Sequence, residues 1–213
     1  MNEITTRENI YKHIRNALID KVENPFIGMD TESPVYHPMK ETDDVTFAQE
    51  FTRVAGKFVY CENDEDLAQK LKYIIMENKL QNVFCFEEKL KPLLEEFEIP
   101  FNAKPDMVLE VATGISFCEC LVSRMGSVVV SSVQFSGRRL HALPEIHIIV
   151  AYTSQLVTDL KDAFALLKVK YQNTLPSSIT VITGPSRTAD IEKTLVMGAH
   201  GPKELYVFLV EAN

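Results

Sequence analysis

Apolar and polar residues follow one another along this chain in a pattern that predicts helices and strands in turn. Residues 4–21 carry apolar side chains at mostly helical spacing, which predicts an N-terminal helix. Residues 24–44 hold three prolines and several apolar side chains, and are too apolar for a disordered linker. We expect them to form an extended arm on the domain or on a neighbouring subunit. The chain is therefore divided into residues 1–45, helix and arm, and a single domain, 46–213.

Alternating strands and helices open this domain. Helices are predicted at 47–56, 63–78 and 88–97, and strands at 57–61 and 83–86. Asn63 or Asp64 is suited to cap the second helix. Strand–helix units of this length connect parallel strands, so the predicted class is α/β.

The second half of the domain is richer in strands. Strands are predicted at 115–122, 127–132, 146–152, 179–183 and 205–210, and an amphipathic helix at 156–171. The first two strands form a hairpin or flank a loop. The nearly continuous apolar run 146–152 is typical of a sheet covered on both faces. The pattern predicts a three-layer α/β domain with an open sheet, but does not separate one such fold from another.

Composition narrows the function classes. The 213 residues are 46% hydrophobic and 24% charged, which is ordinary for a globular protein, with a net charge of −8. This acidic balance argues against nucleic acid or an acidic membrane surface as partner. No apolar run reaches the roughly twenty residues of a membrane helix, and the polar N-terminus does not resemble a signal peptide. We expect a cytoplasmic protein.

The cysteines do not suggest a metal centre. Cys61, Cys85, Cys118 and Cys120 lie in apolar stretches without C-x2-C pairs, so we expect reduced core thiols and no metal. The chain has neither a dinucleotide fingerprint nor a phosphate-binding lysine loop. We therefore predict no bound cofactor.

A long polar segment between the last two strands is the strongest candidate for a site. It contains GPSRTADIE at 184–192 and GAHGP at 198–202. Long polar loops at strand ends are more often binding loops than filler, and an arginine fork suits a carboxylate or phosphate. We expect a small-anion pocket here, bound by Gly184, Ser186, Arg187, Thr188 and Gly201.

Two residues of this segment are candidates for acid–base catalysis. His200 lies in the Gly-Ala-His-Gly-Pro turn and is either a general acid–base group or anion donor, or a turn histidine that bonds a backbone carbonyl. Asp190 is either catalytic or the cap of a short helix at 191–197. The segment follows strand 179–183, and ligands of open α/β sheets bind beyond the carboxyl ends of strands.

Two other loops offer ligand-binding residues. In the segment 123–127 we expect Arg124, Gly126 and Ser127 to contact the anion. In the segment 137–141, Arg139 is expected to contact phosphate beside a second arginine and a histidine, although surface salt bridges explain these charges equally well. His147 lies inside an apolar strand, and we expect it to be a buried core histidine with its hydrogen bonds satisfied.

The two polar strings together resemble the signature of the lactate-utilisation (LUD) domain family. The resemblance extends upstream through 114–130 and 141–147 and covers most of residues 8–211. It implies a fold like that of the NagB/RpiA/CoA-transferase superfamily. It also implies a role in oxidising L-lactate to pyruvate beside iron–sulfur or cysteine-rich partner proteins. Where this family usually has Glu-Thr before the glycine, this chain has Arg124-Met125.

Other readings remain open at this point, including whether the chain is an enzyme. A sugar-phosphate isomerase needs a base beside phosphate donors, for which His200 and Asp190 are candidates. A CoA transferase needs a glutamate nucleophile, and Glu119 is the candidate in the middle of the chain. A regulatory or assembly protein would use the apolar arm as a partner surface, for example to form a homo-oligomer.

Overall fold

The computed structural model describes residues 5–19, 26–29, 36–104, 111–172, 174–191 and 194–212. The chain divides into two compact units, Met1–Pro38 and Met39–Asn213.

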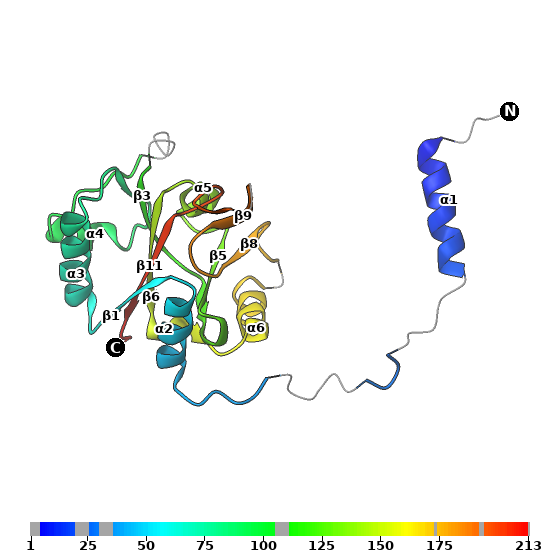
Figure 1. The fold of residues 1–213 in the computed structure, drawn as a ribbon, viewed down its shortest axis with the longest axis horizontal. Helices are drawn as coiled ribbons and strands as arrows, with labels where there is room; N and C mark the ends of the chain where they lie inside the picture. The colour runs from blue at the N-terminus through cyan, green and yellow to red at the C-terminus, as the bar shows by residue number, and fades with distance from the viewer. Residues whose placement is uncertain are drawn as a thin grey trace. The chain divides into compact units, whose positions relative to one another are not determined.

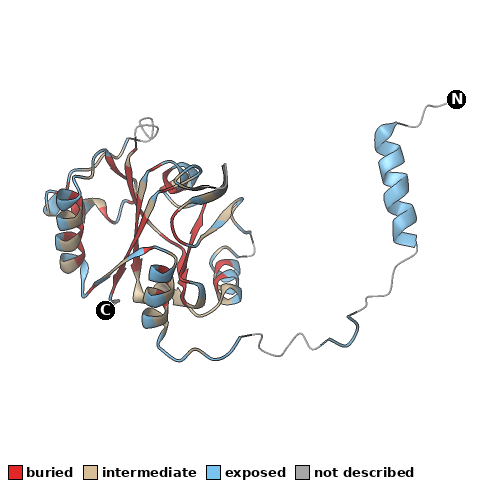
Figure 2. Ribbon diagram, in the orientation of Figure 1, coloured by how far each residue is buried: buried red, intermediate tan, exposed pale blue. Residues whose placement is uncertain are grey.

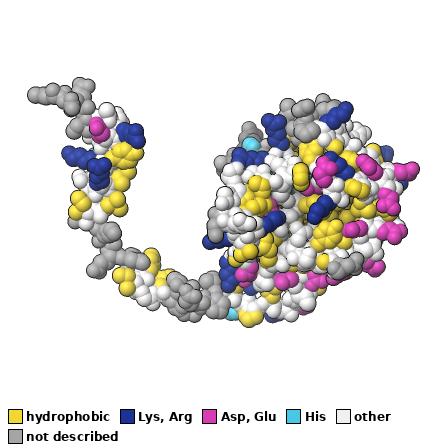
Figure 3. Space-filling view, turned by 180° about the vertical axis from the view of Figure 1, so that it is seen from behind, with side chains coloured by type: hydrophobic (Ala, Val, Ile, Leu, Met, Phe, Trp, Pro, Cys, Tyr) yellow, Lys and Arg dark blue, Asp and Glu magenta, His cyan; other side chains and the backbone are white. Residues whose placement is uncertain are grey.

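The first unit contains helix α1 (Thr6–Ile19), in agreement with the predicted helix. None of its residues is buried, and Ile10, Ile14 and Leu18 expose an apolar stripe at four-residue spacing. Figure 3 shows apolar side chains gathered on this helix. Much of the expected arm at 24–44 falls outside the described residues, so its contacts stay a prediction.

The second unit is built on a parallel sheet of five strands (Figure 1). Its spatial order is β1 (Lys57–Cys61), β11 (Glu204–Val210), β6 (Ile146–Tyr152), β3 (Thr113–Phe117) and β2 (Val83–Cys85). Every neighbouring pair is parallel. The predicted α/β class, with a central parallel sheet flanked by helices, is confirmed.

Two helices, α3 (Asp64–Glu77) and α4 (Lys91–Glu96), cover one face of this sheet (Figure 1). The side chain of Asn63 accepts a hydrogen bond from the Asp66 amide at 2.9 Å, so the predicted cap of α3 is present. The apolar stripe of α3 enters a buried cluster with Ile148 of β6 and Phe208 of β11. Burial of this stripe fixes the helix on the sheet.

A second, four-stranded sheet lies over the other face. Its order is β7 (Leu156–Val157), β4 (Cys120–Val122), β5 (Ser127–Ser131) and β8 (Ile179–Ile182). Together with α2 (Asp43–Arg53), it encloses a core in which Phe47 and Val128 meet Ile149 and Val207 of the parallel sheet. Helix α6 (Leu160–Lys170) packs on its far side. Figure 2 shows the strands as the most deeply buried elements.

The sequence did not reveal this second sheet, because the apolar run 115–122 divides between two strands. Its first part is β3 of the parallel sheet, and its last residues are β4 of the second sheet. β4 and β5 do form an antiparallel hairpin around the 3-10 turn η2 (Ser123–Met125). Within a continuous apolar run, the sequence does not indicate where one strand ends and the next begins in a different sheet.

Three local predictions are wrong. The helix predicted at 156–171 starts only at Leu160, because η3 (Thr153–Gln155) is followed by the short strand β7 at Leu156–Val157. The segment 137–141 lies in helix α5 (Gly137–Ala142) and is not a loop. Instead of a helix at 191–197, the chain forms a hairpin of β9 (Arg187–Ile191) and β10 (Thr194–Met197). Asp190 therefore lies within a strand and caps no helix there.

Candidate functional site

A cavity of about 530 Å³ lies between β8, α5 and the turn before β11. We call it the arginine pocket. It is lined by Ser131, Ser132, Arg138, His141, Ala142, Ser178, Thr180, Val181, Ile182, Thr183, Gly184, Ser186, Arg187, His200, Gly201, Pro202 and Leu205. Among these described residues there are two arginines and two histidines, and no Asp or Glu. Such a lining favours an anion.

Both polar strings of the sequence meet at this pocket. The Ser186 amide donates a hydrogen bond to Pro202 O at 2.8 Å, and the Gly198 amide donates one to Ser186 O at 2.9 Å. These bonds hold the GPSRT segment against the HGP turn. Of the residues predicted for this segment, the pocket gathers Gly184, Ser186, Arg187, His200 and Gly201.

The two other predicted residues of the segment lie on the hairpin. Thr188 pairs with Val196 across β9 and β10 and is not among the lining residues. The backbone of Asp190 belongs to β9, and its side chain falls outside the described part of the structure. Its acid–base role stays a prediction.

The pocket does not lie where the strand-end rule puts it. β8 is an edge strand of the second sheet and runs antiparallel to β5, so the rule for parallel strands does not apply to it. His200 and Leu205 lie at the amino end of β11. Ligand access is therefore expected at the amino end of this parallel strand, next to the edge of the second sheet.

Two glycines allow α2 to approach the loops beside the pocket. Gly126 has φ +56°, and a Cβ there would lie 2.3 Å from the Phe51 amide nitrogen. Gly184 has φ +80°, and its Cβ would lie 2.4 Å from Val54 O. Gly126 does not line the pocket, so its left-handed backbone conformation is explained by the close packing of α2 against this turn.

The hydroxyl of Ser127 reaches the pocket only indirectly. Ser127 is buried, and its Oγ lies 2.8 Å from Thr183 Oγ1, which belongs to a lining residue. Of the residues predicted in the segment 123–127, Ser127 is thus connected to the pocket through one hydrogen bond.

Arg124 makes an ion pair away from this lining. Its Nε donates to Asp159 Oδ1, and its terminal nitrogen lies 3.5 Å from Oδ2. The side chains are only 21% and 19% exposed, so the pair ties η2 to the start of α6. The structure does not bring Arg124 to the arginine pocket.

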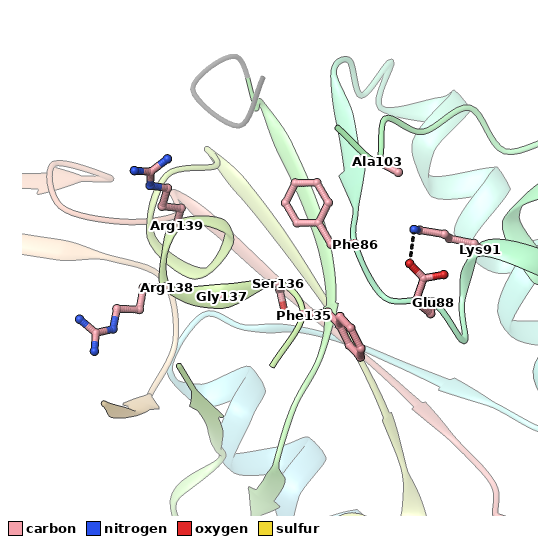
Figure 4. A pocket seen from close by; sticks show the side chains of 9 residues that line it. All are labelled: Phe86, Glu88, Lys91, Ala103, Phe135, Ser136, Gly137, Arg138 and Arg139. Atoms are coloured by element: carbon pink, nitrogen blue, oxygen red, sulfur yellow. Dashed lines mark hydrogen bonds and ion pairs between the residues drawn. The ribbon is translucent and has the colours of Figure 1, made fainter. Parts of the chain in front are cut away.

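Arg139 lies at a different cavity, which we call the phenylalanine pocket. It has a volume of about 320 Å³ and includes Phe86 and Phe135 (Figure 4). In Figure 4 the guanidinium groups of Arg138 and Arg139 extend away from Phe86. Arg138 lines both cavities and donates to Ser177 Oγ at 2.6 Å. In helix α5, residues 138, 141 and 142 share a face, which is why Arg138 rather than Arg139 reaches the arginine pocket.

A chain of buried polar groups beneath α5 escaped the sequence analysis. Ser136 Oγ donates to Glu87 Oε1 at 2.6 Å and lies 3.2 Å from His141 Nε2. The His141 ring stacks on that of His147, with centroids 5.6 Å apart, and His147 Nε2 lies 2.9 Å from Ser116 Oγ. The signal in the sequence was the pair His141 and His147, six residues apart. Had a helix been predicted at 137–142, it would have indicated the direction of the His141 side chain.

Burial decides the charge of both histidines. It lowers the pKa of His141 to about 4, although the negative charge of Glu119 opposes this shift. It lowers the pKa of His147 to about 3, and the neighbouring His141 ring adds to the shift. Both rings are therefore neutral at pH 7.

Glu119 is anchored and is not poised to act as a nucleophile. Its side chain is fully buried and accepts hydrogen bonds from Lys170 at 2.6 Å, Tyr171 at 2.7 Å and Ser131. Burial opposes its ionisation, but these three donors outweigh that effect and lower its pKa. Both carboxylate oxygens are occupied, so Glu119 serves the packing of α6 against the second sheet.

The cysteines are all buried and unpaired. In the part of the chain that the structure describes, no group of three or more His, Cys, Asp or Glu could hold a metal ion. Within the same residues, no helix combines the length and apolar character that crossing a membrane requires.

Comparison with known proteins decides the family. The LUD domain family matches residues 46–210. This chain belongs to the LUD domain family. The LUD domain is 36% identical to Lactate utilization protein C of Geobacillus thermodenitrificans over 109 residues, which is 50% of this chain and 45% of that protein. It is 38% identical to Lactate utilization protein C of Bacillus subtilis over 99 residues, 46% of this chain and 41% of that protein.

A solved structure shares the fold. The DUF162 family protein from Deinococcus radiodurans aligns with a TM-score of 0.59 and 15% identity, over 79% of this chain and 96% of that one. The chain spans about half the length of the curated relatives it matches. All described residues that line the arginine pocket fall inside the matched LUD domain.

Proposed function

We propose that this LUD domain is a cytoplasmic lactate-utilisation protein that takes part in oxidising L-lactate to pyruvate and binds a small carboxylate in the arginine pocket. The observation that carries the proposal is the convergence of Arg138, Arg187 and His200 on one cavity without an acidic lining residue. The proposed pathway is taken from the names of the relatives, and the proposed ligand class is taken from the side chains that line the pocket.

The lining suits a small carboxylate. A guanidinium offers two parallel N–H donors to the two carboxylate oxygens, and such bidentate pairs are stronger than neutral hydrogen bonds. Arg187 stands on the motif segment and Arg138 on α5, so a ligand between them is held from two elements. Acidic side chains are scattered over the face of the unit shown in Figure 3, and the net charge is −8. The attraction for an anion is therefore local to the pocket.

His200 is the proposed acid–base group of the pocket, since it is exposed at the turn where the two motif segments meet. We place the electron carriers in partner proteins rich in iron–sulfur centres or cysteine, and we propose that copies of the chain itself are a second kind of partner. Pull-down of the full chain from cells grown on lactate tests for these partners.

Calorimetric titration of the full chain with L-lactate tests the pocket. We expect binding by the wild type and at least 10-fold weaker binding by Arg187→Ala, because a charge-assisted bidentate contact is lost. Arg53→Ala is the matched control, since Arg53 is largely exposed on α2 and lies outside the pocket. Equal affinity of Arg187→Ala and wild type would contradict the proposal, as would failure of the wild type to bind lactate.

A further inference from the structure

The hydrogen bonds beneath α5 fix which nitrogen of His141 carries a hydrogen. Ser136 Oγ lies 2.6 Å from Glu87 Oε1, and both residues are at least 95% buried. A carboxylate can only accept and a hydroxyl has one hydrogen, so Ser136 donates to Glu87. His141 Nε2, 3.2 Å from the same oxygen, must then be the donor in its own bond with Ser136. The hydrogen therefore sits on Nε2.

The other ring nitrogen is left with a lone pair. Burial lowers the pKa of His141 to about 4, so the neutral ring at pH 7 has a single N–H. Within the described residues Nδ1 has no hydrogen-bond partner. His141 lines the arginine pocket while its Nε2 is turned to Ser136, so Nδ1 is the nitrogen available to a ligand.

We infer that His141 Nδ1 accepts a hydrogen bond from the hydroxyl group of a 2-hydroxycarboxylate in the arginine pocket, and so selects such acids over acids that lack the hydroxyl. The inference rests on the proposed function. Arg138 and Arg187 can only donate, and they serve the ligand's carboxylate. The ligand's own hydroxyl hydrogen needs an acceptor, because an unpaired buried hydroxyl is unfavourable. His141 provides it, held in place by Ser136 and Glu87.

Affinities for L-lactate and propionate, measured by calorimetry on the full chain, test this selection. The two acids differ only by the hydroxyl group. We expect the wild type to bind lactate about 10-fold more tightly than propionate. His141→Gln can still donate to Ser136 but loses the acceptor at the Nδ1 position, so the ratio falls to about 1 while propionate affinity is kept. His141→Asn is the matched variant, since its amide oxygen can take the place of Nδ1 and retain part of the preference.

Nitrogen-15 NMR of the histidine rings gives a second readout that needs no substitution. It is expected to show His141 protonated on Nε2 alone at pH 7. A hydrogen on Nδ1, or equal wild-type affinity for lactate and propionate, would overturn this inference and leave the proposed function standing. Failure of the wild type to bind either acid would overturn the proposed function, and this inference with it.

Discussion

The Phe51 amide nitrogen of α2 lies so close to Gly126 that a Cβ on Gly126 would be 2.3 Å away from it. This approach joins the helix before β1 to the turn between β4 and β5. Phe51 itself is fully buried in the core between the two sheets. The turn therefore determines how near α2 can come to the second sheet.

Gly126→Ala is expected to destabilise the chain by about 3 kcal/mol or more, from left-handed backbone strain and displacement of α2 together. Gly137→Ala is the matched control, because Gly137 has nearly the same φ, +57°, with nothing within 4 Å of an added Cβ. The free energy of unfolding of Gly137→Ala should fall by only about 1–2 kcal/mol, because this variant suffers the backbone strain alone. Urea unfolding of the three proteins measures both values, and equal losses would show that the contact with α2 is unimportant.

The stacked histidines predict a pH dependence of stability. Their folded-state pKa values, about 4 for His141 and about 3 for His147, lie below the ordinary value of 6.5. The contribution of the two neutral rings to the free energy of unfolding is fully present above pH 6.5. It is lost as the pH falls towards the folded-state pKa values, because the unfolded chain then binds protons that the folded chain does not.

Replacing one histidine should remove part of this dependence. His147→Gln is expected to reduce the loss of unfolding free energy between pH 6 and pH 5 by about 1 kcal/mol. Gln can still bond Ser116, and His13→Gln, at an exposed position of α1, is the control. Urea unfolding at several pH values measures the slopes, and an unchanged slope for His147→Gln would refute the buried neutral pair.

The two adjacent arginines of α5 are expected to differ in function. Arg138 lines the arginine pocket and Arg139 lines only the phenylalanine pocket, since successive helical residues point about 100° apart. Arg138→Ala should weaken lactate binding about 5- to 10-fold, and Arg139→Ala should leave it within 2-fold. Calorimetry with both variants checks this, and a larger loss of affinity for Arg139→Ala than for Arg138→Ala would contradict the assignment of Arg138 to the ligand.

Much of the fold could be predicted because buried strands in a parallel sheet are continuous apolar runs with polar ends. The buried strand at 146–152 has the predicted limits, as does the edge strand at 57–61, and the cap at Asn63 marks the start of α3. The prediction failed where the signal was short. Helix α5 has six residues, fewer than two turns, so its period was not visible at 137–142.

The same contrast holds for the site. Arg187 and His200 stand in strings rich in glycine and proline, and this composition marked them as binding loops. His141 owes its place to a hydrogen bond with Ser136 and to stacking on His147, six residues further along the chain and in a different element. Contacts of this kind depend on tertiary packing, and a single sequence does not display them.

The described walls of the arginine pocket come from one continuous stretch, from Ser131 to Leu205. Gly184 at its edge touches earlier sequence through Val54 at the end of α2. One part of the gene therefore encodes all the described lining residues of the candidate pocket. Exchange or lengthening of the chain ahead of α2 would therefore replace none of the described residues that line the arginine pocket.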